Sequence, residues 1–144
     1  ATSIGYGDND DATVVSSTTS VFLRKTFQIE NEQDVVRAFV HVDYDDGFVA
    51  YLNGTEIARR GLSGEPPAFN AFATDHEAVI YAGGLPEGFE IQNIGTLLKT
   101  GENVLAVQVH NATANSSDLT IIPILTLGFA GGGENNLSEY VALG

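Results

Sequence analysis

Short segments in which hydrophobic and polar residues alternate make up most of this chain. In residues 20–30, SVFLRKTFQIE, one set of alternate positions is mainly apolar and the other is mainly polar. Residues 35–44 and 103–111 alternate in the same way. A period of two residues is typical of a β-strand with one buried face. The longest apolar segment, 118–129, also predicts a strand, and Pro123 within it favours an edge or a bulge.

Turns separate these strands, and helical periodicity is weak. The pair Asn53-Gly54 joins GFVAYL to TEIARR and predicts a tight hairpin, because both residues tolerate positive φ. Residues 91–103 leave room for one short helical turn. The Pro- and Gly-broken connection 61–86 is expected to hold no more than a short strand at 77–82. A connection of that length is usually functional or crosses between sheets.

These elements predict an all-β fold, with two antiparallel sheets packed as a β-sandwich of the jelly-roll type. A length of 144 residues fits one domain with a single core. We expect this domain to span residues 1–130. The glycine-rich start of residues 131–144 favours a C-terminal linker or a short terminal strand there.

The charge balance narrows the classes of partner. Nineteen acidic residues against six basic ones give a formal net charge of −13. Such a surface repels phosphate backbones, so we expect no nucleic acid partner, and it suits cations better. Solubility in a salty or extracellular setting would also explain the excess. No apolar stretch approaches the roughly 18 residues that a membrane span requires, so membrane insertion is not expected. Cysteine is absent, which excludes disulfides and thiolate chemistry.

Two motifs resemble a known family. LLKTGENVLAVQVHN (97–111) resembles the L-x-x-G-x-N-x-L-A-V-x-V-x-N segment of galactose-binding-like jelly rolls, which include many carbohydrate-binding modules. DDGFVAYLNGTEIARR (45–60) resembles the D-D-G-x-x-x-Y-L-N-G hairpin of the same folds. The likeness extends over residues 4–128, and the opening and closing segments are similar to those of modules from bacterial secreted multimodular proteins. It implies a non-catalytic binding domain, often with a structural calcium, although such folds host many functions.

The acidic loop DNDD, after GYG, is a candidate calcium site. Asp8, Asp10 and Asp11 supply the oxygen ligands that a hard cation requires, and Asp118 at the start of the last long strand is a candidate partner. The EF-hand pattern is absent. The alternative is a solvated turn, because Asp and Asn side chains readily bond their own backbone in loops.

A second candidate site combines polar strand faces with aromatic residues. If the strands at 20–30, 35–44 and 103–111 are neighbours, their polar faces form one surface. Sugars bind to arrays of hydrogen-bonding groups beside an aromatic platform. An ordinary solvated sheet is the alternative, and an arginine pair could instead anchor the connection 61–86. The candidate carbohydrate-binding residues are Arg37, His41, Asp43, Tyr44, Tyr51, Arg59, Arg60, His76 and His110.

The leading hypothesis is a non-catalytic carbohydrate-binding module with a structural Ca²⁺. It would attach a larger secreted or cell-surface protein to a polysaccharide or oligosaccharide, next to other domains of the same polypeptide. The alternative is a structural or adhesive β-sandwich that spaces other domains without binding glycan. A small hydrolase is a third possibility, but no nucleophile elbow accompanies the three histidines, so we expect no enzyme activity.

Overall fold

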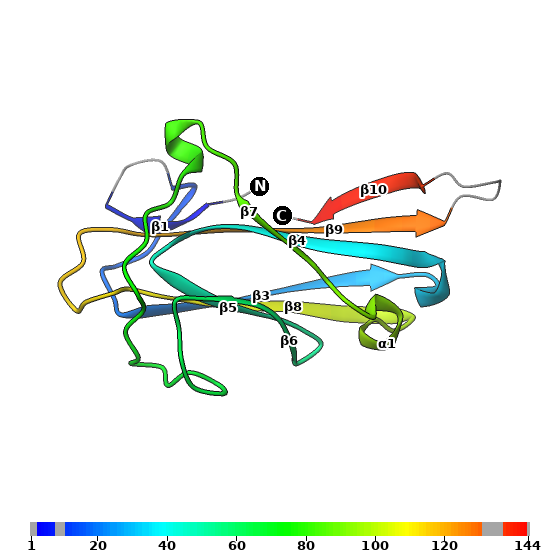
Figure 1. The fold of residues 1–144 in the computed structure, drawn as a ribbon, viewed down its shortest axis with the longest axis horizontal. Coiled ribbons are helices and arrows are strands. Elements are labelled where there is room, and N and C mark those ends of the chain that lie inside the picture. The colour runs from blue at the N-terminus through cyan, green and yellow to red at the C-terminus, as the bar shows by residue number, and fades with distance from the viewer. Residues whose placement is uncertain (1–2, 8–10, 131–136, 144) are drawn as a thin grey trace.

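A computed structural model describes residues 3–7, 11–130 and 137–143, and it confirms the predicted β-sandwich (Figure 1). The first sheet, here the β9 sheet, has the order β2-β1-β9-β4-β7, with β10 also paired to β9. The β1–β2 pair is parallel, and the other pairs of this sheet are antiparallel. Its strands are β1 (Ile4–Tyr6), β2 (Thr13–Val14), β4 (Val35–Asp45), β7 (Glu87–Glu90), β9 (Leu119–Ala130) and β10 (Leu137–Leu143).

The second sheet, here the β8 sheet, is antiparallel throughout, with the order β3-β8-β5-β6. Its strands are β3 (Ser20–Ile29), β5 (Gly47–Leu52), β6 (Thr55–Arg60) and β8 (Gly101–His110). Three short helical elements complete the described structure, namely η1 (Glu32–Asp34), η2 (Ile80–Ala82) and α1 (Ile94–Leu97). Within the described residues, no helix has the length and apolar character needed to cross a membrane.

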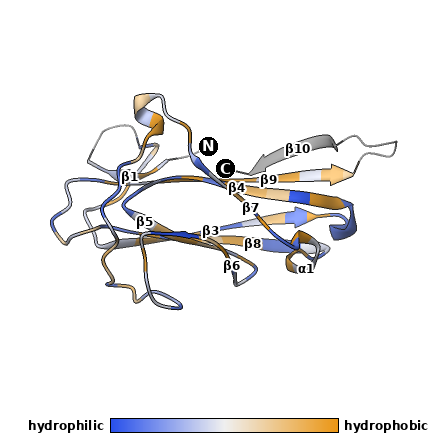
Figure 2. Ribbon diagram, in the orientation of Figure 1, coloured by the Kyte–Doolittle hydropathy of each residue, from blue (hydrophilic) through white to orange (hydrophobic). Residues whose placement is uncertain are grey.

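The core fills the space between the two sheets. Alternate residues of β3, β4 and β8 face inward over most of their length, as the sequence pattern predicts, and the hydrophobic colour runs along much of β4 and β9 in Figure 2. Complete burial of an aliphatic or aromatic side chain stabilises a fold by about 1.5–3 kcal/mol. Among the largest fully buried side chains are Val40, Val42, Phe48, Leu52, Leu125 and Leu127.

Pro123 has a different role from the predicted one, because β9 is not an edge strand. One side of β9 pairs with β4 over most of its length. On the other side, β1 pairs with residues 119–121 and β10 pairs with residues 125–130. Pro123 lies between these two segments, where no described residue of β1 or β10 pairs with β9. A residue without a backbone N–H is therefore tolerated in the middle of the sheet.

Two of the connections between the sheets lie at one end of the sandwich, on the left of Figure 1, and concern the candidate residues. Residues 45–47 form the corner through which the chain leaves β4 and enters β5. The connection 61–86 crosses back from β6 to β7 at the same end, so the expected crossing between sheets is confirmed. The strand predicted at 77–82 is wrong. The 3-10 turn η2 forms there, because the carboxylate of Asp43 binds the backbone N–H groups of Val79 and Ile80.

The two family-like motifs meet at the opposite end of the sandwich, beside α1. Asn53 and Gly54 have φ values of 50° and 85°, which confirms the predicted hairpin turn. The Asn53 side-chain amide donates to Asn103 Oδ1 at 2.7 Å and to the carbonyl oxygen of Leu97 at 2.8 Å. Its carbonyl oxygen accepts from the backbone N–H of Val104. The asparagine of each motif thus serves the architecture, since it joins the hairpin to β8 and α1.

Candidate functional site

The single polar surface predicted from alternation does not form, because its strands belong to different sheets. Strand β4 lies in the β9 sheet, whereas β3 and β8 are neighbours in the β8 sheet. Arg37 and His41 therefore project from one outer face of the sandwich, and Arg24 and Gln108 project from the opposite face. Alternation shows which side of a strand is buried, but it does not show which strands are adjacent.

On the outer face of the β9 sheet, Arg37 and His41 flank Phe39. The Arg37 guanidinium lies 5.1 Å from the Phe39 ring centroid and forms an ion pair with Glu90 at 3.0 Å. The ring of His41 stacks on Phe39 at 6.2 Å. It also covers Gly88 on β7, where an added Cβ would lie 2.9 Å from the imidazole. Arg37 and His41, both predicted as sugar ligands, therefore lie together on either side of Phe39. These three half-exposed side chains are here called the Arg37–His41 row.

Asp43, predicted as a sugar ligand, is instead an anchor for the connection 61–86. Its side chain is buried, and each carboxylate oxygen accepts one backbone hydrogen bond, from Val79 at 2.8 Å and from Ile80 at 2.9 Å. A carboxylate that is satisfied in this way has little capacity left for a ligand. The sequence gives no sign of this role, since the partners are 36 and 37 residues away.

Tyr44 and His76 pack against each other and form no exposed platform. Their rings stack with centroids 4.0 Å apart, and Tyr44 belongs to the buried core. The Tyr44 hydroxyl donates to Glu87 at 3.1 Å. Burial, together with the nearby charge of Glu87, raises the pKa of Tyr44 to about 12. His76 Nδ1 lies 3.0 Å from the carbonyl oxygen of Tyr44, so it fixes the connection 61–86 to β4.

For Arg59, the contacts support the alternative that it anchors the connection 61–86, whereas Arg60 binds strand β7. Arg59 forms a two-pronged ion pair with Glu56 and also donates to two carbonyl oxygens of the turn that follows β6. Its hydrogen bonds lower the pKa of Glu56. Arg60 binds Glu87 and lies over the Phe89 ring at 4.6 Å. Both guanidinium groups are therefore engaged within the protein.

His110 is completely buried at the end of β8. Its Nδ1 lies 2.8 Å from the carbonyl oxygen of Ala71, and Phe22 packs edge-on against it at 6.0 Å. Its Nε2 is buried and has no hydrogen-bond partner among the described residues. The connection 61–86 thus covers this histidine, which has no direct access to a glycan.

The structure describes only part of the predicted calcium set. Asp8 and Asp10 lie outside the described residues. Asp11 packs against β1, where a Cβ added at Gly5 would lie 2.6 Å from its nearer carboxylate oxygen. Asp118 faces two acids that the sequence prediction did not assign to a metal, Asp45 and Glu77. The calcium prediction for the DNDD loop stays a prediction.

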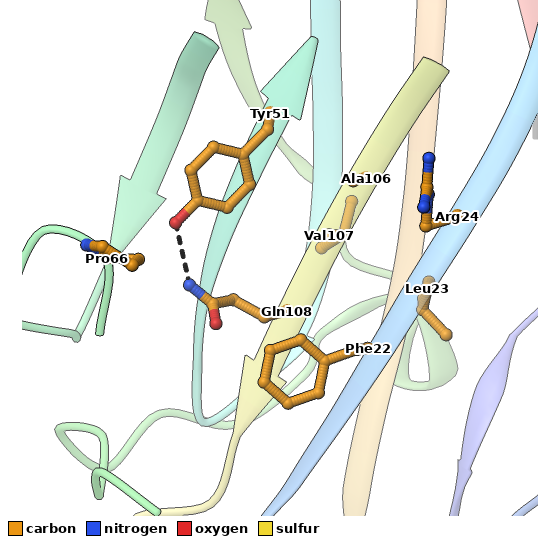
Figure 3. Close-up of a pocket in the computed structure, with 8 residues that line it drawn as sticks. All are labelled: Phe22, Leu23, Arg24, Tyr51, Pro66, Ala106, Val107 and Gln108. Carbon is orange, nitrogen blue, oxygen red and sulfur yellow. Dashed lines mark hydrogen bonds between the residues drawn. The ribbon is translucent and has the colours of Figure 1, made fainter. Parts of the chain in front are cut away.

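A groove on the outer face of the β8 sheet contains the last of the predicted residues, Tyr51. It encloses about 270 Å³ between β3, β8 and β5, with Pro66 on the far side of Tyr51 (Figure 3). Gln108 lies between the rings of Tyr51 and Phe22 in this view. The lining residues are Phe22, Leu23, Arg24, Tyr51, Pro66, Ala106, Val107 and Gln108.

Contacts between strands hold the polar groups of the groove in place. Phe22 stands directly opposite Gln108 in the β3–β8 pair. The Gln108 side-chain N–H donates to the Tyr51 hydroxyl at 2.9 Å, and burial raises the pKa of Tyr51. The Gln108 amide oxygen accepts no hydrogen bond from the described residues, and Arg24 forms no ion pair with any of them. Phe22 is 59% exposed.

The sequence interpretation placed Gln108 on the predicted polar surface, but it did not select Phe22 as a ligand residue. A signal for Phe22 was present, because it is the one large apolar residue on the polar face of residues 20–30. For Gln108, alternation predicts a polar strand face, but its neighbours Phe22 and Tyr51 depend on strand pairing that the sequence does not show.

Solved structures share this fold. The chain matches an α-L-rhamnosidase from Streptomyces avermitilis, solved with L-rhamnose, at a TM-score of 0.56 and 20% identity over 90% of this chain. It matches the α-L-rhamnosidase from Aspergillus terreus at a TM-score of 0.58 and 13% identity over 99% of this chain. A third match is the enzyme of the same name from Dictyoglumus thermophilum, at a TM-score of 0.55 and 15% identity over 87% of this chain.

These matches show the fold alone. The chain spans only 10%, 15% and 12% of the three solved chains, in the order given. No protein-family model and no curated protein sequence matches this chain. The likeness therefore supports a small β-sandwich of the kind found within larger proteins, and it assigns no residue a function.

Proposed function

We propose that this chain is a non-catalytic carbohydrate-binding module and that its site is the groove on the outer face of the β8 sheet. The observation that carries this proposal is the pair of aromatic side chains, Phe22 and Tyr51, on either side of the Gln108 amide. Aromatic faces stack on the C–H surfaces of sugars, and a fixed amide selects the hydroxyl groups beside them. Tyr51 retains its predicted role, whereas the other predicted sugar ligands lie elsewhere.

The chemistry of the groove suits a short stretch of polysaccharide. The Gln108 amide oxygen is an acceptor for a sugar hydroxyl, and the Arg24 guanidinium is a donor. Apolar lining with a few convergent polar groups is the usual composition of a ligand site. Among the described residues that line the groove, none carries a carboxylate. Cleavage of a glycoside by paired acids would therefore have no residues in this groove, and for that reason we propose binding without catalysis.

The comparisons support a carbohydrate-related setting in a limited way. The matched proteins are named as α-L-rhamnosidases, which act on sugars, and this chain spans a small share of each. We propose that the chain is likewise one module of a larger secreted or cell-surface protein, which it attaches to polysaccharide. The resemblance of its motifs to those of bacterial secreted modules points the same way.

The test is affinity electrophoresis on a panel of soluble neutral and uronic acid polysaccharides. Phe22→Ala should weaken retention on the bound polysaccharide about tenfold, which corresponds to about 1.4 kcal/mol. The matched control is Phe39→Ala, which removes the same side chain from the opposite face of the sandwich and should leave retention unchanged.

Three results would contradict the proposal. Loss of retention in Phe39→Ala alone would move the site to the Arg37–His41 row. No retention of the parent chain by any polysaccharide would favour the structural or adhesive spacer. Shortening of a retained polysaccharide would favour the hydrolase.

A further inference from the structure

At one end of the sandwich, three carboxylates from distant parts of the sequence meet, and we propose that they bind one calcium ion. Asp45 ends β4, Glu77 belongs to the connection 61–86, and Asp118 immediately precedes β9. Each offers one carboxylate oxygen, and the three oxygens all lie within 4.8 Å of one another. Two oxygens bound to one calcium at about 2.3–2.6 Å can be separated by up to about 5 Å. The observed spacing therefore allows all three to contact the same ion.

The surroundings of Asp45 are an independent sign of a ligand. Asp45 is only 5% exposed. Its carboxylate accepts no hydrogen bond and forms no ion pair with the described residues, and it faces the other two acids. Buried carboxylates are normally hydrogen-bonded, paired or bound to a metal, because desolvation of an unpaired charge is costly. A bound cation supplies the missing partner.

The neighbouring Asp46 holds the two loops that carry the other ligands. One of its carboxylate oxygens accepts the backbone N–H of His76 at 2.9 Å, directly before Glu77. The other accepts the backbone N–H of Ala112 at 2.6 Å, in the loop that leads to Asp118. The two hydrogen bonds of Asp46 thus hold the loops of Glu77 and Asp118 next to Asp45. They use none of the three carboxylates that we propose as calcium ligands. Such a preorganised arrangement lowers the entropic cost of binding.

The ligand chemistry points to calcium. Carboxylate oxygens without imidazole or thiolate suit hard cations and not zinc or copper. Calcium accepts irregular geometry and completes its six to eight ligands with carbonyl oxygens and water, whereas magnesium demands a near-octahedral arrangement. This set shares Asp118 with the calcium site predicted from the DNDD loop. It depends on none of Asp8, Asp10 and Asp11.

The test is isothermal titration calorimetry of the whole chain with calcium chloride, alongside thermal unfolding in EDTA and in calcium. We expect one ion per chain. At a hundredfold excess over Kd, calcium should raise the Tm by about 5–12 °C. Glu77→Gln and Asp45→Asn should each weaken calcium binding at least tenfold. Asp34→Asn makes the same charge change on an exposed acid of η1 and should bind calcium like the parent chain. Glu77 is exposed, so its variant tests the site even if Asp45→Asn does not fold.

Either of two results would overturn the proposal. One is a melting curve of the parent chain that millimolar calcium does not shift. The other is unchanged calcium affinity in Glu77→Gln and Asp45→Asn together with lost affinity in Asp10→Asn, which would place the ion in the DNDD loop. Both outcomes leave the proposed glycan groove untouched, because none of its lining residues belongs to this set.

Discussion

Three aspartates within four positions, Asp43, Asp45 and Asp46, have three different surroundings. Asp43 and Asp46 each accept two backbone hydrogen bonds from loops far away in the sequence. Asp45 accepts none from the described residues, and burial, together with the charges of nearby acids, raises its pKa to about 7. From the sequence alone, Asp43 is a predicted sugar ligand, and Asp45 and Asp46 are predicted to form a turn with Gly47 between two strands. Their actual roles depend on loops that cross this end of the sandwich, and no local pattern specifies those crossings.

The buried Asn103 side chain gives a prediction at the scale of one residue. It accepts from Asn53 and from the backbone N–H of Lys99, and it donates to the carbonyl oxygens of Lys99 and Gly101. Asn103→Ala leaves these groups buried and unpaired, so we expect it to lower the free energy of unfolding by about 3 kcal/mol. Urea denaturation measures this change. Asn31→Ala, which removes one exposed hydrogen bond, should cost about 1 kcal/mol or less. Equal losses would show that the motif asparagine has no special structural role.

At the scale of elements, the sequence predicts what depends on local pattern. The long strands, the Asn53-Gly54 hairpin and the short helical turn before Gly101 all follow from alternation and turn chemistry, and the structure confirms them. Strand β7 was not predicted, because Glu-Gly-Phe-Glu has little strand character of its own. It forms because the edge of β4 offers unpaired backbone groups. The groove could not be predicted from local pattern either, because it forms only where β3, β8 and β5 lie side by side in the sheet.

The connection 61–86 gives a prediction at this scale, since Asp46 fastens it to the loop after β8. Asp46→Ala removes the acceptor for the backbone N–H groups of His76 and Ala112. Bonds to a charged acceptor contribute about 1.5–3 kcal/mol, so hydrogen exchange at both amides should become at least tenfold faster. The amide of Val107 in the core of β8 reports global unfolding and should accelerate less. Equal acceleration at all three amides would mean that Asp46 stabilises the whole fold and not this junction.

At the scale of the whole molecule, composition and pattern together predict the architecture but not the sites. The sandwich follows from alternation, strand lengths and the absence of long helical segments in the sequence. The sites do not follow in this way: of the predicted sugar ligands only Tyr51 lines the groove, and the proposed calcium set shares only Asp118 with the predicted one. The two proposed sites lie on different parts of the molecule. The groove lies on the outer face of the β8 sheet, and the three carboxylates lie at the end where the chain changes sheet. Each can therefore fail or succeed without the other.

The net charge of −13 gives the last prediction, because it acts on the molecule as a whole. Like charges on a compact surface repel one another, and folding brings them closer together. The Debye length falls from about 30 Å at 0.01 M salt to about 10 Å at 0.1 M, so sodium chloride should raise the Tm by roughly a few degrees over that range. The double variant Glu30→Gln and Asp34→Asn removes two exposed negative charges and should respond less steeply. A Tm that falls or stays constant with salt would show that the acids are already neutralised by local partners. The same titration sets the baseline for calcium, since a millimolar divalent salt adds little ionic strength, and a larger Tm shift then reports a bound ion.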